Sequence, residues 1–242
     1  DKVRKVVGQP GPDNSPLWSP DGRFILFASA GGRLDYFARN VGLAVVPAEG
    51  GPVRPLTGAF DENAGAVAWN ADGIYFGAMQ RTAAHLYRLD PVTLQIARLS
   101  SPDDAIVSGF SFSADGKRAA FQAASPTSLP EICVSEFPFK ARALTRMTGQ
   151  AEAFVLGSRE VISWKSKDGA EIEGVLIKPA GFDPARKYAL LCVIHGGPTG
   201  VDRPVLLSPD ARYYPSDIWA ARGALILKVN YRGSAGYGAK FR

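Results

Sequence analysis

The stretch that decides the fold is Tyr188-Ala-Leu-Leu-Cys-Val-Ile-His195-Gly196-Gly197-Pro198. Six apolar residues in a row, 189–194, predict a strand buried on both faces, as in parallel sheets covered by helices. Cys192, inside this run, is then expected to be a small core residue. The glycine pair lets the backbone turn sharply and approach a ligand. Because open α/β sheets bind ligands at the carboxyl ends of their strands, we expect the functional site here.

The segments around this strand extend the α/β pattern. Downstream, residues 214–221 have helical spacing and are followed by Gly223 at a helix C′ position, and residues 224–230 predict another buried strand. Upstream, residues 161–165 and 171–178 predict two antiparallel strands joined at Asp168-Gly169. The acidic residues of 171–178 partly alternate with apolar ones, which favours a half-exposed edge strand.

The first part of the chain is repetitive instead. Trp18-Ser-Pro-Asp-Gly22 recurs as Trp69-Asn-Ala-Asp-Gly73 and Phe112-Ser-Ala-Asp-Gly116, 51 and 43 residues apart. Each Asp-Gly favours a tight hairpin turn, and the aromatic residue before it is expected to pack between neighbouring sheets. A period of about 40–50 residues with four strands is typical of a β-propeller blade. The register of the three units favours a propeller over a β-sandwich.

The two patterns predict two domains. Residues 1–150 are expected to form a partial β-propeller of about three blades, within 13–148, and residues 151–242 to form the N-terminal part of an α/β-hydrolase domain. Three blades cannot close a ring, since propellers have at least four. Further blades are therefore expected before the start of this sequence.

Several motifs together resemble one enzyme family. His-Gly-Gly-Pro, the later Asn230-Tyr-Arg-Gly-Ser-Ala-Gly-Tyr-Gly238 and the entry segment 163–179 are similar to the start of the catalytic domain in prolyl oligopeptidase family serine peptidases. The acylaminoacyl-peptidase and dipeptidyl-peptidase-like branches have the nearest pattern. The resemblance implies acyl transfer to hydrolyse short peptides at a site that the propeller gates.

The resemblance also implies roles for individual residues. The peptide N–H of Gly197, with Gly196 as the alternative, would help to hold the tetrahedral oxyanion, and such a donor is typically worth about 3–4 kcal/mol. His195 either donates a ring N–H to the same oxygen or only braces the loop. Tyr231 and Arg232 are expected to support the loop, with Arg232 paired to a carboxylate.

The residues that break the bond are not recognisable in the sequence. No Gly-x-Ser-x-Gly occurs, and Ser234, in Arg232-Gly-Ser-Ala-Gly236, is interpreted as a turn residue. His85 is interpreted as a packing or surface histidine. No catalytic residue is assigned in this chain, and the Ser/Asp/His triad is expected after Arg242. The expected partners are short peptides and the remainder of the same polypeptide, or a nicked C-terminal chain that carries the triad.

Composition excludes some other classes. With 46% hydrophobic and 21% charged residues the chain is typical of globular proteins. The net charge of +5 comes from scattered residues and does not indicate a nucleic-acid surface. No apolar run indicates a membrane span, and no spacing indicates a metal site, cofactor or disulfide. The two cysteines mildly favour a reducing, cytoplasmic compartment. A catalytically inactive propeller/hydrolase-like binding module is the alternative function.

Overall fold

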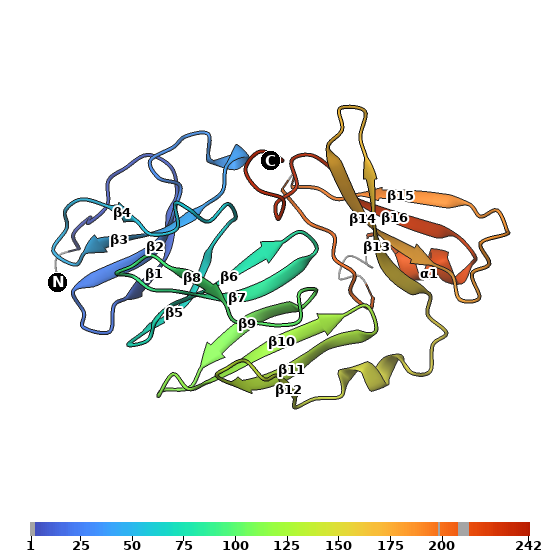
Figure 1. Cartoon of the computed structure of the whole chain (residues 1–242), viewed down its shortest axis with the longest axis horizontal. Helices are drawn as coiled ribbons and strands as arrows, with labels where there is room; N and C mark the ends of the chain where they lie inside the picture. Colours follow the sequence, from blue (N-terminus) through green and yellow to red (C-terminus); the bar gives the residue numbers. More distant parts are fainter. Residues whose placement is uncertain (1–2, 198, 208–212) are drawn as a thin grey trace.

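The computed structural model describes residues 3–197, 199–207 and 213–242. Pro198 of the His-Gly-Gly-Pro motif and residues 208–212 lie outside the described residues. Antiparallel strands dominate the first part of the chain, and a mixed sheet with one α-helix forms the second (Figure 1).

The first part consists of short four-stranded units. One sheet contains β1 (Asp13–Trp18), β2 (Phe24–Ser29), β3 (Gly42–Pro47) and β4 (Arg54–Pro55) in sequential order. A second unit contains β5 (Gly65–Asn70), β6 (Gly73–Gln80), β7 (Ala83–Leu89) and β8 (Ile96–Arg98). A third contains β9 (Ile106–Phe112), β10 (Arg118–Ser125), β11 (Ser128–Glu136) and β12 (Arg142–Ala143). A parallel pairing of Ala84 with Ile106 joins the second and third units into one eight-stranded sheet.

The repeated Asp-Gly turns have the expected conformation. Gly22 and Gly116 both have φ of 70°, which allows β1–β2 and β9–β10 to form tight hairpins. The preceding aromatic residues differ in their surroundings. Phe112 packs on Tyr75 of the neighbouring unit at 4.6 Å, and Trp69 lies against the largest apolar cluster. Trp18 is 61% exposed, so the expectation that each aromatic packs between sheets is wrong at that position.

The second part is built on a four-stranded sheet. Its strands are β13 (Ser158–Lys165), β14 (Glu171–Lys178), β15 (Leu190–Ile194) and β16 (Leu225–Asn230), arranged in the order β13-β14-β16-β15. Only β15 and β16 are parallel. Helix α1 (Ser216–Ala221) lies on this sheet, with Ala220 in a buried cluster with Val175 and Ile226. Two 3-10 turns complete the elements, η1 (Tyr36–Ala38) and η2 (Met147–Ala151).

Two expectations about burial are wrong. Strand β15 is not buried on both faces: Leu190 is 56% and Ile194 is 64% exposed, and Cys192 is exposed rather than a core residue. The reason is that β15 lies at the edge of the sheet and pairs only with β16, while α1 contacts β14 and β16. Conversely, β14 lies inside the sheet between β13 and β16, and its Glu173 is only 9% exposed.

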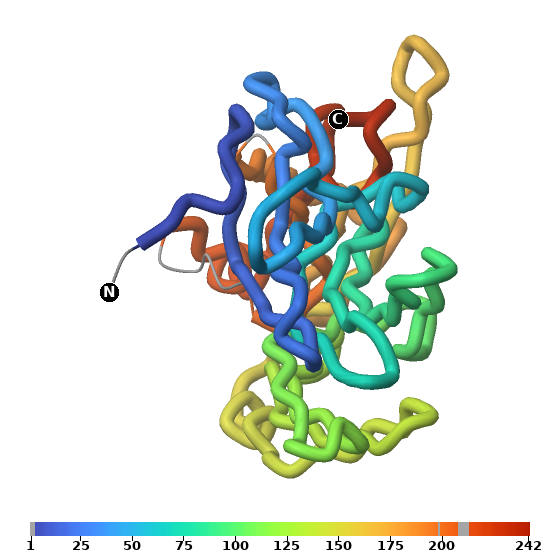
Figure 2. Tube along the Cα trace, turned by 90° about the vertical axis from the view of Figure 1, so that its left-hand side faces the viewer, coloured from blue at the N-terminus to red at the C-terminus, as the bar shows by residue number. Residues whose placement is uncertain are grey.

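The second part of the chain meets the first through its last residues. The C-terminal segment runs beside the loop that follows β4, as both views show (Figures 1 and 2). Arg242 donates from Nη1 to Asn40 at 2.9 Å and to Asn63 at 3.0 Å. The domain boundary near residue 150 falls at η2 and stays a prediction. None of the described helices is long and apolar enough to cross a membrane.

Candidate active site

The candidate site begins where β15 ends. The chain turns immediately after Ile194, and Gly197 adopts φ of 130°, a conformation that strongly favours glycine. A Cβ at Gly197 would lie 2.7 Å from the Thr199 nitrogen, whereas a Cβ at Gly196 would meet no atom within 4 Å. Both glycines are exposed, and within the described residues neither N–H donates a hydrogen bond. Two adjacent backbone donors are therefore available to a ligand.

His195 is held from several sides. The Tyr231 hydroxyl donates to the His195 carbonyl oxygen at 2.7 Å, and the two rings stack with centroids 4.6 Å apart. The ring nitrogens also have partners: Nε2 lies 3.0 Å from Ser234 Oγ, and Nδ1 lies 3.1 Å from the Gly196 carbonyl oxygen. The structure thus brings His195, Gly196, Gly197 and Tyr231 together in one loop cluster.

Arg232 points away from this cluster, toward the β13–β14 hairpin. Its guanidinium forms an ion pair with Asp168, which precedes the turn glycine of that hairpin. The Ser166 hydroxyl is the main cause of the lowered pKa of Asp168, and Arg232 contributes less. Since both side chains of the pair are about half exposed (51% and 55%), the ion pair orients the loop more than it stabilises the fold.

A buried polar network lies beneath the same loop. Asn230, at the end of β16, is fully buried and bonds the backbone of Asp202 in both directions: it accepts from the Asp202 N–H at 2.7 Å and donates to the Asp202 carbonyl oxygen at 3.0 Å. Lys228, two residues earlier on the same face of β16, donates to the Asp202 carboxylate at 2.9 Å. The network ties the segment that follows Gly200 to β16.

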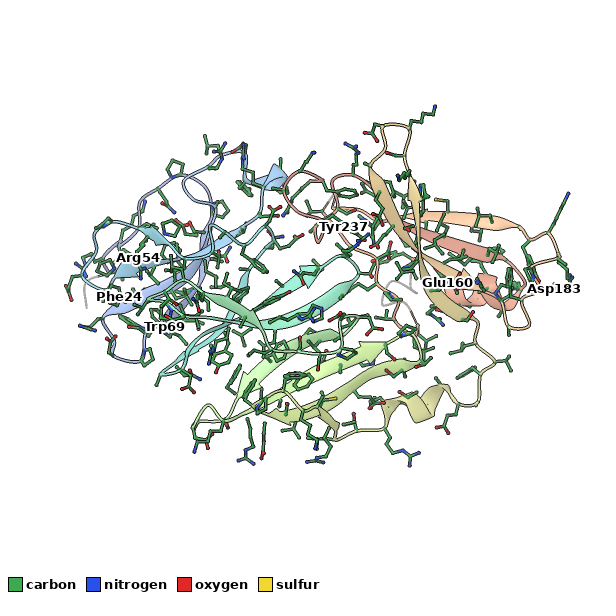
Figure 3. All side chains as sticks on the ribbon, viewed as in Figure 1. Phe24, Arg54, Trp69, Glu160, Asp183 and Tyr237 are labelled. Carbon is green, nitrogen blue, oxygen red and sulfur yellow. The ribbon has the colours of Figure 1, made fainter. Side chains whose placement is uncertain are left out.

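The network continues to the first part of the chain through Tyr237 (Figure 3). Asn230 donates to the Tyr237 hydroxyl at 3.0 Å, and this hydroxyl donates to Glu173 at 2.9 Å. Burial is the main cause of the raised pKa of Tyr237, and the neighbouring Glu173 charge adds to it. Glu173 also pairs with Arg81 at 2.7 Å, which explains why an acidic residue is tolerated inside β14.

Glu62 makes the other connection between the two parts. Its carboxylate accepts from the Gly236 N–H at 3.0 Å and from the Gly238 N–H at 2.6 Å, while the Arg81 N–H donates to the Gly236 carbonyl oxygen at 2.6 Å. Burial raises the pKa of Glu62 even though these two backbone bonds oppose the shift. Sequence reasoning missed Glu62, Arg81 and Asp202, because no local motif marks them. The glycines at 236 and 238 were the only signal of a close backbone approach.

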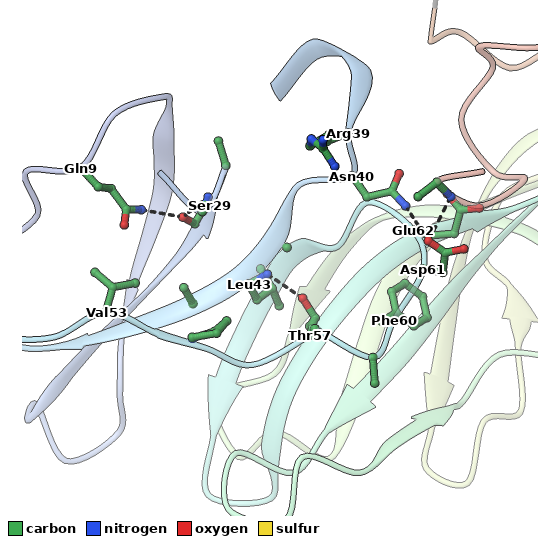
Figure 4. A pocket seen from close by; sticks show the side chains of 18 of the residues that line it. Gln9, Ser29, Arg39, Asn40, Leu43, Val53, Thr57, Phe60, Asp61 and Glu62 are labelled. Carbon is green, nitrogen blue, oxygen red and sulfur yellow. Dashed lines mark hydrogen bonds between the residues drawn. The ribbon is translucent and has the colours of Figure 1, made fainter. Parts of the chain in front are cut away.

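Two cavities adjoin this junction. One, of about 810 Å³, is lined by residues of both parts, among them Glu62, Arg81 and Tyr237. The other, of about 630 Å³, lies mainly within the first part, and Figure 4 shows Asp61 and Glu62 at its wall.

The other two residues weighed from the sequence, His85 and Ser234, are both buried. His85 is 1% exposed and bonds Ser100 and the Asp103 carbonyl oxygen, each at 3.0 Å, as a packing histidine. Ser234 is fully buried. Among the described residues, no group of three or more His, Cys, Asp or Glu side chains is placed to hold a metal ion.

Comparison with known proteins agrees with the motifs. No family model matches the chain. The chain is 26% identical over 243 residues to dipeptidyl-peptidase 5 of Trichophyton schoenleinii, and equally to that of Arthroderma benhamiae, with 98% of the chain covered. The resemblance to the prolyl oligopeptidase family is thereby confirmed. The chain spans about one third (33%) of the length of these dipeptidyl-peptidase relatives.

Solved structures show that the fold is shared with known peptidases. An acylaminoacyl peptidase of Pyrococcus horikoshii superposes with a TM-score of 0.72 at 22% identity over 91% of this chain and 33% of its own. A dipeptidyl aminopeptidase IV-like protein of Bacteroides ovatus gives 0.70 at 18% identity, over 94% of this chain and 35% of its own. The chain therefore has a propeller-plus-hydrolase type of fold, in which sheet structure dominates.

Proposed function

We propose that this chain is the part of a serine peptidase that supplies the oxyanion loop and one wall of the substrate cleft. Its three four-stranded units are three propeller blades, residues 1–150, and residues 151–242 are the start of the hydrolase domain. The Ser/Asp/His triad is contributed from beyond Arg242, by the same polypeptide or by an associated chain. The substrates are short peptides with an acylated or free N-terminus.

One observation carries the proposal: Gly196 and Gly197 are exposed at the carboxyl end of β15, and neither of their N–H groups donates a hydrogen bond to any residue that the structure describes. A donor of this kind accelerates acyl transfer when it points at the developing oxyanion and does not have to reorganise. The braced His195 and the close packing of Gly197 against Thr199 keep these donors in place. We assign the main oxyanion contact to Gly197 and the alternative to Gly196.

The test is made on the protein that continues past Arg242. We expect it to hydrolyse short acylated or dipeptidyl amide substrates, and the 242-residue chain alone to show no turnover and no labelling by serine-directed fluorophosphonates. Gly197→Ala is expected to lower kcat by about 10²-fold or more, because a Cβ 2.7 Å from the Thr199 nitrogen displaces the donor.

Gly196→Ala is the matched control, since a Cβ there meets nothing within 4 Å, and its kcat should stay close to that of the parent protein. Equal losses in the two variants would contradict the assignment of Gly197. A continued protein with an intact triad that hydrolyses no amide would instead favour the alternative function, an inactive binding module.

A further inference from the structure

Ser234 is the residue of the glycine-rich loop that the proposed function leaves without a role. It lies 39 positions from His195 in the sequence, yet its Oγ is 3.0 Å from His195 Nε2. The side chain is fully buried, so it is not accessible to a substrate. Its own backbone N–H bonds the Tyr231 carbonyl oxygen at 3.0 Å, which fixes the turn that presents the hydroxyl to the ring.

The partners of the two ring nitrogens determine where the proton of the neutral ring lies. Nδ1 lies 3.1 Å from the Gly196 carbonyl oxygen, and a carbonyl oxygen can only accept. Nδ1 must therefore carry the hydrogen, and Nε2 must be the acceptor. The only group that the described structure offers to Nε2 is the Ser234 hydroxyl, which can donate.

The surrounding chain restrains the ring on two sides. Tyr231 covers one face of the ring, with the ring planes inclined by 23°. A Cβ at Gly200 would lie 2.8 Å from His195 Nδ1 and 2.7 Å from the Gly196 oxygen. The loop therefore packs closely against the Nδ1 edge of the ring at Gly200. The His195 ring thus bonds the carbonyl oxygen of Gly196. The N–H of the same peptide group belongs to Gly197, the proposed oxyanion donor.

We propose that Ser234 is a positioning residue: its hydroxyl donates to Nε2 of the Nδ1–H tautomer that the Gly196 carbonyl oxygen selects, and the His195 ring held in this way fixes the peptide between Gly196 and Gly197. This inference rests on the proposed function for its catalytic meaning, but its structural content does not. It assigns His195 to bracing the loop rather than to donating a ring N–H to the oxyanion, because both ring nitrogens are engaged.

The chain contains only two histidines, and His85 serves as an internal reference for His195. His85 Nε2 lies 3.0 Å from the Asp103 carbonyl oxygen, so His85 must be the Nε2–H tautomer, with Nδ1 accepting from Ser100. The two histidines should therefore show opposite tautomers in the same sample. Long-range ¹H–¹⁵N correlation spectra of the imidazoles separate the two forms directly.

We would record these spectra on the 242-residue chain at about pH 8.5, where an unperturbed imidazole, with a pKa of about 6.5, is neutral. The expected result is Nδ1–H for His195 and Nε2–H for His85. Ser234→Ala should keep His195 in the Nδ1–H form but move its Nε2 resonance downfield, because this acceptor nitrogen loses its donor, and it should leave the His85 signals unchanged. Tyr231→Phe, which removes the hydroxyl bond to the His195 carbonyl oxygen but touches neither ring nitrogen, should leave both tautomers as they are.

An Nε2–H tautomer for His195 in the unmodified chain would overturn the proposal, even if Ser234→Ala did not fold. So would an unchanged His195 Nε2 resonance in a folded Ser234→Ala variant, with the His85 signals as the measure of folding. In the continued, active protein, Ser234→Ala should lower kcat by about tenfold to a hundredfold with little change in KM, and fluorophosphonate labelling should persist. If that protein is inactive, the proposed function fails, while the spectra still decide the role of Ser234.

Discussion

Replacing Asn230 with alanine tests whether the buried network holds the loop that follows the oxyanion glycines. The substitution removes both bonds between the Asn230 amide and the Asp202 backbone, at 2.7 and 3.0 Å, in a fully buried position. Buried peptide groups left without partners cost about 1–3 kcal/mol each, and the relaxation of the loop recovers part of this. We therefore expect a local loss of about 2–3 kcal/mol.

This local free energy can be measured at one amide. Since 1.36 kcal/mol corresponds to a factor of ten, hydrogen exchange at the Asp202 N–H should accelerate by about 30- to 150-fold in Asn230→Ala. The matched control is Asn63→Ala, which removes a comparable bond to the Val41 N–H at 2.8 Å in the first part of the chain. The control should leave exchange at Asp202 unchanged.

The reasoning would be refuted if Asp202 exchanged in Asn230→Ala within about threefold of the unmodified rate, because the Lys228–Asp202 ion pair would then hold the loop alone.

Three further predictions follow from single contacts. Gly236→Ala should be about 1–3 kcal/mol less stable than Gly233→Ala in urea unfolding. The backbone φ is positive at both glycines, but only the Cβ at 236 lies 2.8 Å from a backbone oxygen, that of Arg81. Equal losses of stability in the two variants would exclude the clash. Burial raises the pKa of Tyr87 from 10.0 to about 12. The contribution of this raised pKa to the free energy of unfolding should be complete below pH 10 and should be lost between pH 10 and 12. Tyr87→Phe should therefore reduce the fall in Tm over this range. Hydrogen bonds, of which that from the Thr145 hydroxyl has the largest effect, lower the pKa of Glu131 from 4.5 to about 2. The stabilisation that the ionised Glu131 gives to the fold should therefore disappear as the pH drops from 4.5 to 2. Glu131→Gln should reduce this acid dependence of Tm.

The strands and turns of the chain were predictable because they depend on neighbours in the sequence. Each Asp-Gly pair fixes its own hairpin, and the strand that ends at His195 is defined by its own apolar run. The family resemblance was likewise carried by contiguous motifs. Local patterns of this kind identify an element and its type, and the structure agrees with them.

Burial and partnership were less predictable because they depend on distant residues. An apolar run does not reveal whether its strand lies inside a sheet or at the edge, and β15 lies at the edge. Glu173 resembles an exposed residue of an alternating strand until Arg81 is placed beside it by the fold. Glu62 meets Gly236 across 174 positions, and no pattern of residue types along the chain encodes such a pairing.

The contact between Glu62 and the glycine-rich loop has a consequence for exchanging whole domains. On the loop side the carboxylate bonds the main-chain N–H groups of Gly236 and Gly238, so this contact does not depend on matching side chains there. A foreign propeller should therefore reproduce this contact if its corresponding turn presents one carboxylate, while the side-chain contacts of Arg242 and Arg81 would have to be matched separately. Chimaeras built on that rule could change the rim of the cleft without redesigning the joint that supports it.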